Sequence, residues 1–468
     1  MTRILLVEDD PTFGPFLTSE LAQQEREIEV RHVESRDGAL DALGSDVWDL
    51  VICDLKIPAE NGGLDAAVEH GMAVIAEAQR ISPGTPMIVL SAFHTIEIAQ
   101  RLTEAARQED IYGSTTLERM IRFFQKSEVD RCLGAAKQHA AALLRLGEIE
   151  VIGVEATAER RVLRVFAARQ DGNRVRASSI GGGLSSARVM KVQVFRGDAR
   201  VGSVLCRVAG KAEADREIAA YDRFVAPMLP NGLFTPRMPQ IVQGAGQAVG
   251  IFYTLIGSGD VSLFDVLRTD PGAATALLQQ LRQGTAPWVQ AAAAAAVAVG
   301  DIRRSFISDA AFASVQGRLI GCRWADAEAR VIQIRRGPQH NDLHGLNILV
   351  DSNRPVMIDF AEVADAPSAT DPVTLELSNY FHPRGVRCSG EARARILAGE
   401  WWTGAPDPAL AAFVLECRQW ANTVAAGDRE CLACAYGFAV RQLKYEDTDK
   451  ELAAAIACAA VNALLATF

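Results

Sequence analysis

The sequence predicts an α/β fold with two different parts. The first is a doubly wound, parallel five-stranded sheet, and the second is an α+β region that becomes mostly helical toward its end. Up to about residue 130, short apolar runs alternate with stretches of helical periodicity, which is typical of a parallel sheet covered on both faces. From Val175 the pattern is β-like, and after Ser262 it is mostly helical.

Composition limits the functions that the chain can have. Its 468 residues allow several domains of roughly 100–200 residues, and 49% hydrophobic with 23% charged residues is typical of folded globular protein. A net charge of −10 repels phosphate backbones, so we expect no nucleic-acid partner. The sequence shows neither a signal-peptide pattern nor an apolar run that could cross a bilayer, so we expect a cytoplasmic protein without a membrane partner.

Each element of the first part has its own signal. Helical periodicity through Phe16 and Leu21 follows the first strand, and a stretch rich in alanine and leucine closes this part as a helix over 128–146. The short apolar runs predict strands at 4–7, 28–33, 50–53, 87–92 and 122–126.

The second part begins after a connecting region, 147–174, that contains another helical stretch. Strands are predicted at 189–195, 203–208 and 251–256, with a helix over 213–229 between the last two. The alanine-rich run 291–299 is predicted to be helical, because alanine has the highest helix propensity. Beyond residue 262, only the cluster between 340 and 360 interrupts the helical pattern.

Acidic and polar residues stand where the predicted parallel strands end. Glu8 and Asp9 follow the first strand, Asp54 follows the third, and Ser91 and Lys126 end the fourth and fifth. These strand ends share one edge of the sheet, where three carboxylates need a hard cation such as Mg²⁺ between them. A carboxylate beside Mg²⁺ can attack a phosphoryl group, while a lysine and a hydroxyl bind its oxygens.

The motifs LLVEDDP, CDLKIP, IVLSA and FFQK, in this order, resemble those of response-regulator receiver domains over residues 1–146. The resemblance implies that Glu8, Asp9 and Asp54 bind the metal and that Asp54 accepts phosphate from a cognate histidine kinase. It assigns Ser91 as the switch hydroxyl and Lys126 as the invariant lysine, and it allows a homodimer through this domain. The alternative is a receiver fold that no longer takes phosphate, which the retained acids disfavour.

Two segments depart from the usual receiver pattern. AENGGLDAAVEHG after the CDLKIP motif replaces a short turn, and the 34 residues between Ser91 and Lys126 exceed the usual length. Because this region normally carries the output surface, we expect an atypical choice of partner.

The stretch QHNDLHGLNILVDSNRPVMIDFAEV carries a second constellation. Asp342 and Asn347 form a DxxxxN pattern, and two strand-like runs flanking a turn at 351–354 would bring Asp359 back beside them. Phosphoryl transfer to an alcohol needs a carboxylate that positions the hydroxyl, which suits Asp342. It also needs oxygen ligands for Mg²⁺, which suits Asn347 and Asp359.

HNDLHGLNIL and IDF resemble the catalytic and metal loops of aminoglycoside phosphotransferases and choline kinases over residues 165–468. The resemblance implies a bilobal kinase-like fold, with an N-lobe over 175–257 and a C-lobe over 258–468. It implies ATP and Mg²⁺ as cofactors and a small-molecule or protein hydroxyl as acceptor. His340 would orient the loop backbone. Asp371 would hydrogen-bond the loop, or alternatively cap a helix that begins at Asp-Pro.

The same resemblance predicts a nucleotide site upstream. The strand position that holds a lysine in this family is Arg207 here, and an arginine is not a neutral replacement. Arg207 would pair with Glu217 and grip phosphates, or Lys211 would reach in instead. The residues implied to bind nucleotide are Gly181, Gly182, Gly183, Arg207, Glu217, Tyr253 and Ile256.

Two hypotheses follow from these constellations. The first is a receiver-regulated phosphotransferase that moves the γ-phosphate of ATP to a hydroxyl. The second is a signalling pseudokinase that binds nucleotide or a partner without turnover, which Arg207 favours and the complete Asp342, Asn347 and Asp359 set disfavours. A DNA-binding response regulator is disfavoured by the acidic charge.

Overall fold

The computed structural model divides into two compact units, which we describe separately. Unit 1 comprises Met1–Ala214 and Arg237–Thr254, and unit 2 comprises Asp215–Pro236 and Leu255–Phe468. No helix within the described residues is long and apolar enough to span a bilayer. The structure describes residues 2–22, 28–92, 108–114, 117–179, 189–255, 257 and 259–468.

Unit 1 begins with a parallel five-stranded sheet, as the sequence predicted, and its strand order is β2-β1-β3-β4-β7. A two-stranded hairpin, β5–β6, precedes the last strand. The elements are β1 (Thr2–Val7), α1 (Phe13–Ala22), β2 (Ile28–Val33), α2 (Arg36–Ser45), β3 (Leu50–Cys53), α3 (Val68–Ile81), β4 (Met87–Ser91), β5 (Gln108–Glu109), β6 (Glu118–Arg119), β7 (Ile121–Gln125) and α5 (Val129–Gly147).

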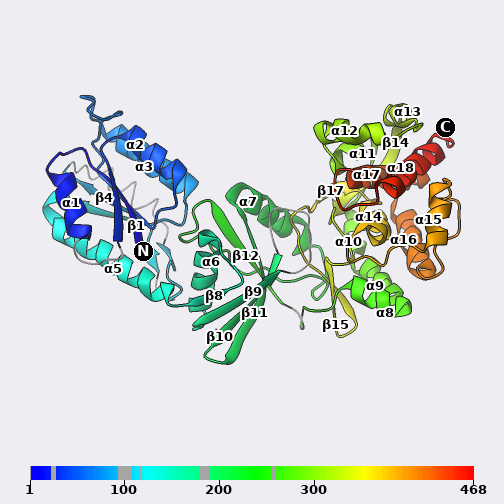
Figure 1. Cartoon of the computed structure of the whole chain (residues 1–468), viewed down its shortest axis with the longest axis horizontal. Helices are drawn as coiled ribbons and strands as arrows, with labels where there is room; N and C mark the ends of the chain where they lie inside the picture. Colours follow the sequence, from blue (N-terminus) through cyan, green and yellow to red (C-terminus); the bar gives the residue numbers. More distant parts are fainter. Residues whose placement is uncertain are drawn as a thin grey trace. The chain divides into compact units, whose positions relative to one another are not determined.

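Two cores cover the two faces of this sheet. Alternate residues of one strand point to opposite faces. Leu5 of β1 therefore joins a cluster with α2 and α3, while Ile4 and Leu6 join a cluster with α1 and α5. Figure 1 shows the same arrangement, with α2 and α3 on one side of the sheet and α1 and α5 on the other.

A second five-stranded sheet in unit 1 has the order β12-β11-β10-β9-β8 and is antiparallel except for its β8–β9 pair. The region 147–174, expected to be a connection, contributes β8 to this sheet and α6 to its core. The three expected strands begin or end within a few residues of the predicted bounds, whereas the α-helix expected over 213–229 ends at Ala220 and is followed by a π-helical stretch, Tyr221–Val225. The elements are β8 (Glu150–Ile152), α6 (Thr157–Ala168), β9 (Arg174–Ser179), β10 (Val189–Arg196), β11 (Ala199–Gly210) and β12 (Ala248–Thr254). Helix α7 (Lys211–Ala220) begins in unit 1 and belongs to unit 2 from Asp215 on.

Specific contacts join the two sheets of unit 1. The carboxylate of Asp49, the residue before β3, accepts a hydrogen bond from Arg161 of α6 at 2.7 Å, and its carbonyl is held on the side of the first sheet by His139 of α5 at 2.8 Å. The turn at Gly84 lies directly against residue Val242, since a Cβ at Gly84 would sit 1.9 Å from the Val242 carbonyl oxygen. The first sheet is therefore packed on the second through more than a covalent link.

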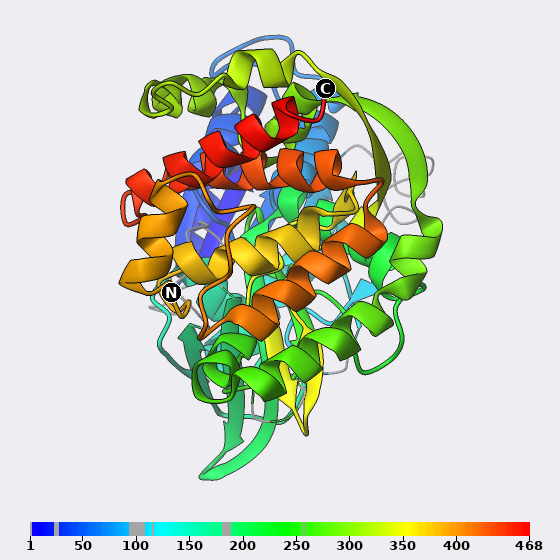
Figure 2. The ribbon, with the colours of Figure 1, turned by 90° about the vertical axis from the view of Figure 1, so that its right-hand side faces the viewer.

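Unit 2 is mostly helical, and Figure 2 shows α17 and α18 (orange-red to red) running side by side. Three short strands form the sheet β13-β14-β17, and β15–β16 form a hairpin. The elements are α8 (Leu263–Thr269), α9 (Pro271–Gly284), α10 (Ala286–Ala291), β13 (Ala293–Ala298), α11 (Val299–Phe306), α12 (Asp309–Val315), α13 (Trp324–Glu328), β14 (Val331–Gln339), β15 (Ile348–Asp351), β16 (Arg354–Met357), β17 (Ala364–Pro367), α14 (Thr370–Phe381), α15 (Gly390–Leu397), α16 (Ala411–Val424), α17 (Asp428–Gln442) and α18 (Lys450–Leu465).

The prediction of a helix over the alanine-rich run 291–299 is wrong, because most of this run forms a strand. Residues 293–298 form β13, which pairs antiparallel with β14 from Ala293↔Arg336 to Ala298↔Val331. Helix propensity is a weak preference that tertiary pairing overrides. The sheet also interrupts the helical pattern earlier than the expected cluster at 340–360.

Candidate functional sites

The carboxyl edge of the first sheet brings the predicted polar residues together. One carboxylate oxygen each of Glu8, Asp9 and Asp54 lies within 4.8 Å of the others. Lys126 reaches both Glu8 and Asp54 at 2.7 Å, and the Ser91 hydroxyl donates to Asp54 Oδ1 at 2.6 Å. Lys126 is the first residue after β7, in a short 3₁₀ turn, so its predicted place at the strand end is nearly right.

Burial and charge oppose one another in this acidic pocket. Glu8 is 1% and Asp54 6% exposed, and burial raises the pKa of Glu8 and of Asp9. Burial alone lowers the pKa of Lys126, but its hydrogen bonds to Asp54 and Glu8 outweigh that effect and the pKa is raised. The lysine therefore stays charged and compensates part of the negative charge. Oxygen donors this close together suit a hard cation such as Mg²⁺.

The segment after Pro58 brings α3 close to the acidic pocket. Gly71, in the first turn of α3, donates its N–H to the Leu55 carbonyl at 3.1 Å. A Cβ at Gly71 would lie 2.4 Å from that oxygen and 2.6 Å from the Asp54 carbonyl. Only glycine permits this approach, so the segment fixes the backbone just after Asp54.

The second constellation is built within unit 2 by one loop and one hairpin. The Asn347 side-chain N–H donates to the Asp342 carbonyl at 2.9 Å, and the Ile358 N–H donates to the Asn347 carbonyl at 3.0 Å. Strands β15 and β16 pair between these points and place Asp359 two residues after β16, beside the loop. The Asn347 side-chain nitrogen is thereby committed as a donor within the loop.

Asp371 holds the backbone of this loop. Its two carboxylate oxygens accept the N–H groups of His340 at 2.8 Å and Asn341 at 2.9 Å. The alternative, that Asp371 caps a helix, is wrong, because α14 begins at Thr370 with no side-chain cap. His340 also contacts the Ile358 carbonyl at 3.0 Å, as expected of a residue that orients the loop.

Backbone strain marks the same loop. Asn341 has φ 64° and Asp359 has φ 62°, in the left-handed region that costs non-glycine residues energy. Such strain persists only where surrounding bonds over-determine the backbone. Here Asp371 supplies those bonds to Asn341.

Arg441 is a residue of this site that sequence reasoning missed. It comes from α17 and pairs with Asp342 Oδ1 at 3.2 Å, while His344 lies 3.6 Å from the other carboxylate oxygen. Burial alone would raise the pKa of Asp342, but the charges of His344, Arg441 and His340 outweigh burial and hold that pKa below its ordinary value. No local pattern could reveal Arg441, since almost a hundred residues separate it from Asp342.

The predicted nucleotide residues are only partly described. Gly181, Gly182, Gly183 and Ile256 lie outside the described residues. Arg207 is buried in β11 and pairs with Glu213 of α7. Tyr253 is buried in β12, opposite Leu205, and Glu217 of α7 is fully buried. The expected pair between Arg207 and Glu217 stays a prediction.

Comparison with known proteins points to the first sheet. A family model of the response regulator receiver domain matches residues 4–120. Response regulator ArlR of Staphylococcus aureus is 33% identical over 92 residues, which is 20% of this chain and 36% of that protein. The chain thus spans about a third of the length of the curated relatives that it matches.

Solved structures that resemble the chain do so over the same part. The receiver domain of the Francisella response regulator 1452 is 16% identical, covering 30% of this chain and 96% of that chain with a TM-score of 0.22. Response regulator TrrA of Thermotoga maritima, solved in complex with Mg²⁺ and BeF, is 31% identical, covering 20% of this chain and 71% of that chain with a TM-score of 0.17.

Proposed function

From the premise that residues 4–120 form a response regulator receiver domain, we propose that the chain is a receiver-regulated phosphotransferase. Receiver domains are phosphorylated by cognate histidine kinases, and in this chain the proposed acceptor is Asp54. The proposed second centre consists of Asp342, Asn347 and Asp359, which would move the γ-phosphoryl group of ATP to a hydroxyl acceptor.

The contacts of Lys126 carry the receiver half of the proposal. The Lys126 ammonium group contacts both Asp54 and Glu8 at 2.7 Å, so it is close enough to bind an oxygen of a phosphoryl group attached to Asp54. Ser91 already donates a hydrogen bond to Asp54 Oδ1 and can transfer it to a phosphoryl oxygen. Mg²⁺ bound by Glu8, Asp9 and Asp54 would neutralise the carboxylates and the incoming phosphoryl oxygens.

The arrangement around Asp342 supports the second half. In phosphoryl transfer the protein mainly positions groups, and a carboxylate that accepts the proton of the attacking hydroxyl is one recurring part. Asp342 is 29% exposed and reachable, with a pKa held low by nearby positive charges. Asn347 and Asp359 stand on the fixed loop and hairpin as the proposed metal ligands. This centre resembles that of aminoglycoside phosphotransferases and choline kinases in its motifs.

Two ion pairs favour the second candidate, a pseudokinase that binds nucleotide or a partner without turnover. Arg207, in the strand-lysine position, is engaged by Glu213. Asp342 is engaged by Arg441 at 3.2 Å. Both ion pairs must break before Arg207 can bind a phosphate group and Asp342 can accept the proton of a hydroxyl group.

The test is ADP release from Mg-ATP by the full chain, with and without an acyl-phosphate donor that charges the receiver. The phosphotransferase proposal expects turnover that Asp342→Ala abolishes and that the donor changes. Asp54→Asn should remove the donor effect, whereas Asp41→Asn, an exposed carboxylate on α2, should keep it. ATP binding without turnover in any form supports the pseudokinase. No ATP binding overturns the phosphotransferase proposal and the nucleotide-binding form of the pseudokinase, and leaves a receiver joined to a part that binds a partner.

A further inference from the structure

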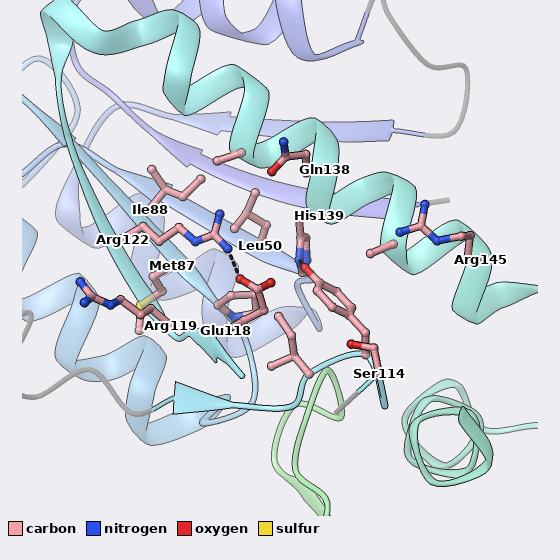
Figure 3. Close-up of a pocket in the computed structure, with 15 residues that line it drawn as sticks. Leu50, Met87, Ile88, Ser114, Glu118, Arg119, Arg122, Gln138, His139 and Arg145 are labelled. Atoms are coloured by element: carbon pink, nitrogen blue, oxygen red, sulfur yellow. Dashed lines mark hydrogen bonds and ion pairs between the residues drawn. The ribbon is translucent and has the colours of Figure 1, made fainter. Parts of the chain in front are cut away.

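A cavity of about 250 Å³ lies at the amino-terminal edge of the first sheet, away from Asp54. Its lining residues come from the starts of β4 and β7, from helix α5 and from the β5–β6 hairpin, and Figure 3 draws them as sticks. Its floor is apolar and buried, and the residues that form it are Leu50, Met87, Ile88, Ile111, Ala135 and Ala142.

The rim of this cavity is positively charged. Arg122 is paired with Glu118, so these two charges compensate each other. Arg119 and Arg145 also line the cavity, on opposite sides in Figure 3, and neither forms an ion pair within the described part of the chain. The rim therefore carries an excess of two positive charges, which remain at any physiological pH because arginine does not deprotonate.

His139 and Tyr112 form the neutral polar end of the cavity. Burial lowers the pKa of His139 to about 4, so the imidazole is neutral at pH 7. Its Nε2–H donates to the Asp49 carbonyl at 2.8 Å. The other ring nitrogen, Nδ1, is therefore the acceptor for the Tyr112 hydroxyl, whose oxygen lies 2.5 Å away. The Tyr112 hydroxyl proton is thus committed to His139, so a carboxylate finds its donors at the arginines of the rim and not at this end of the cavity.

We propose that this cavity binds a small organic anion, a carboxylate carried on an apolar body of one ring or of similar size. An apolar cavity of about 150 Å³ accepts benzene, so a volume of about 250 Å³ holds a ring with a short acidic side chain. The body lies on the apolar floor, and the carboxylate reaches Arg145 at the rim, while Arg119 adds positive charge on the opposite side. Guanidinium groups match the planar geometry of a carboxylate.

The proposed site is separate from the phosphoacceptor pocket and from any kinase activity. Strand β4 is 5 residues long, so the Cα atoms at its two ends stand roughly 13 Å apart. The cavity is next to the contact between the two sheets, because His139 binds the same Asp49 that pairs with Arg161. A bound ligand would therefore act on that contact.

The test is isothermal titration calorimetry of the full chain with three probes of the same size, namely phenylacetate, 2-phenylethanol and 2-phenylethylamine. We expect one phenylacetate per chain, with about tenfold weaker binding of the neutral alcohol and still weaker binding of the amine. Equal affinities for all three, or no phenylacetate binding up to about 1 mM, would overturn the proposal.

Variants of the residues that line the cavity test whether the probes bind there. Arg145→Gln should weaken phenylacetate about tenfold and leave 2-phenylethanol unchanged, while Ala142→Met should fill the floor and weaken both. Arg131→Gln is the control, because Arg131 is another exposed arginine on the same helix and does not line the cavity. Arg145→Gln does not alter the core, so its result stands even if Ala142→Met fails to fold. An identical loss in Arg145→Gln and Arg131→Gln would contradict the site.

Discussion

His139 links the stability of unit 1 to pH at the scale of one residue. Burial lowers its pKa to about 4 from an ordinary value of 6.5, although the hydrogen bond to Asp49 works in the opposite direction. The unfolded chain therefore binds more protons between these pH values. Stability is full above about pH 6.5 and is lost as the pH falls toward 4, by about 3 kcal/mol in total.

We therefore expect His139→Gln to flatten the acid side of the stability profile. Glutamine can still donate to the Asp49 carbonyl, but it does not titrate. Urea unfolding at pH 7 and pH 4.5 should show a smaller loss in this variant than in the parent chain. His70→Gln, which removes a less buried histidine that also contacts a backbone carbonyl, serves as the control. Equal losses in the parent and His139→Gln would contradict the assignment.

The pair between Asp342 and Arg441 gives a second residue-scale prediction. The pKa of Asp342 is lower in the folded chain than in the unfolded chain. The ionised carboxylate therefore stabilises the fold at pH values above the unfolded pKa, and this stabilisation is lost as the pH falls through the folded pKa. The side chains are 29% and 22% exposed, so solvent screens the pair and we expect a coupling of about 0.5–1 kcal/mol. A double-mutant cycle of Asp342→Asn and Arg441→Gln by urea unfolding at pH 7 measures it, and zero coupling would show that the pair is not maintained in solution.

Residues could be predicted from the sequence where a strand end or a short loop fixes them. Glu8, Asp54 and Ser91 each follow or end a parallel strand, and the topology of the sheet brings such positions to one edge. Arg441 and the cavity residues could not be predicted, because they approach their partners through helix packing between distant segments. That packing depends on side-chain shapes that no short motif encodes.

At the scale of elements, β13 shows why alanine is ambiguous. Alanine favours helix by only a few tenths of a kcal/mol per residue over most others, and a strand partner outweighs this. β14 supplies that partner over residues 331–336, and β13 lies at the edge of its sheet. The strands of the first sheet were predictable because their apolar runs are rich in Ile, Leu and Val and are buried on both faces.

Threonine substitutions in β13 distinguish strand from helix. Ala294 and Ala296 are exposed, so their replacement changes propensity with little change in packing. Ala294→Thr with Ala296→Thr should raise the free energy of unfolding by roughly 0.5 kcal/mol in a strand and lower it by a similar amount in a helix. The urea midpoint measures the sign. The same exchange at the exposed Ala310 of α12 should be destabilising and is the control.

At the scale of the whole molecule, we expect the contact between the two sheets of unit 1 to carry a signal out of the receiver. Sequence showed two parts and a connecting region, but it could not show that α6 and the turn at Gly84 join them. The contact is tight, because a Cβ at Gly84 would lie 1.9 Å from the Val242 carbonyl oxygen and 2.6 Å from Gln243 Cα. Backbone atoms on the opposing side cannot rotate away, so any side chain at residue 84 must separate the two surfaces.

Gly84→Ala should therefore uncouple the second sheet from the receiver. We expect beryllofluoride, which mimics a phosphoryl group on the receiver aspartate, to change hydrogen exchange in α6 and in residues 241–247 of the parent chain. In Gly84→Ala the change should remain within the receiver peptides. Gly44→Ala on α2, where an added Cβ meets nothing within 4 Å, should behave like the parent chain. If beryllofluoride altered exchange in the second sheet equally in all three proteins, the signal would leave the receiver by a route that does not involve Gly84.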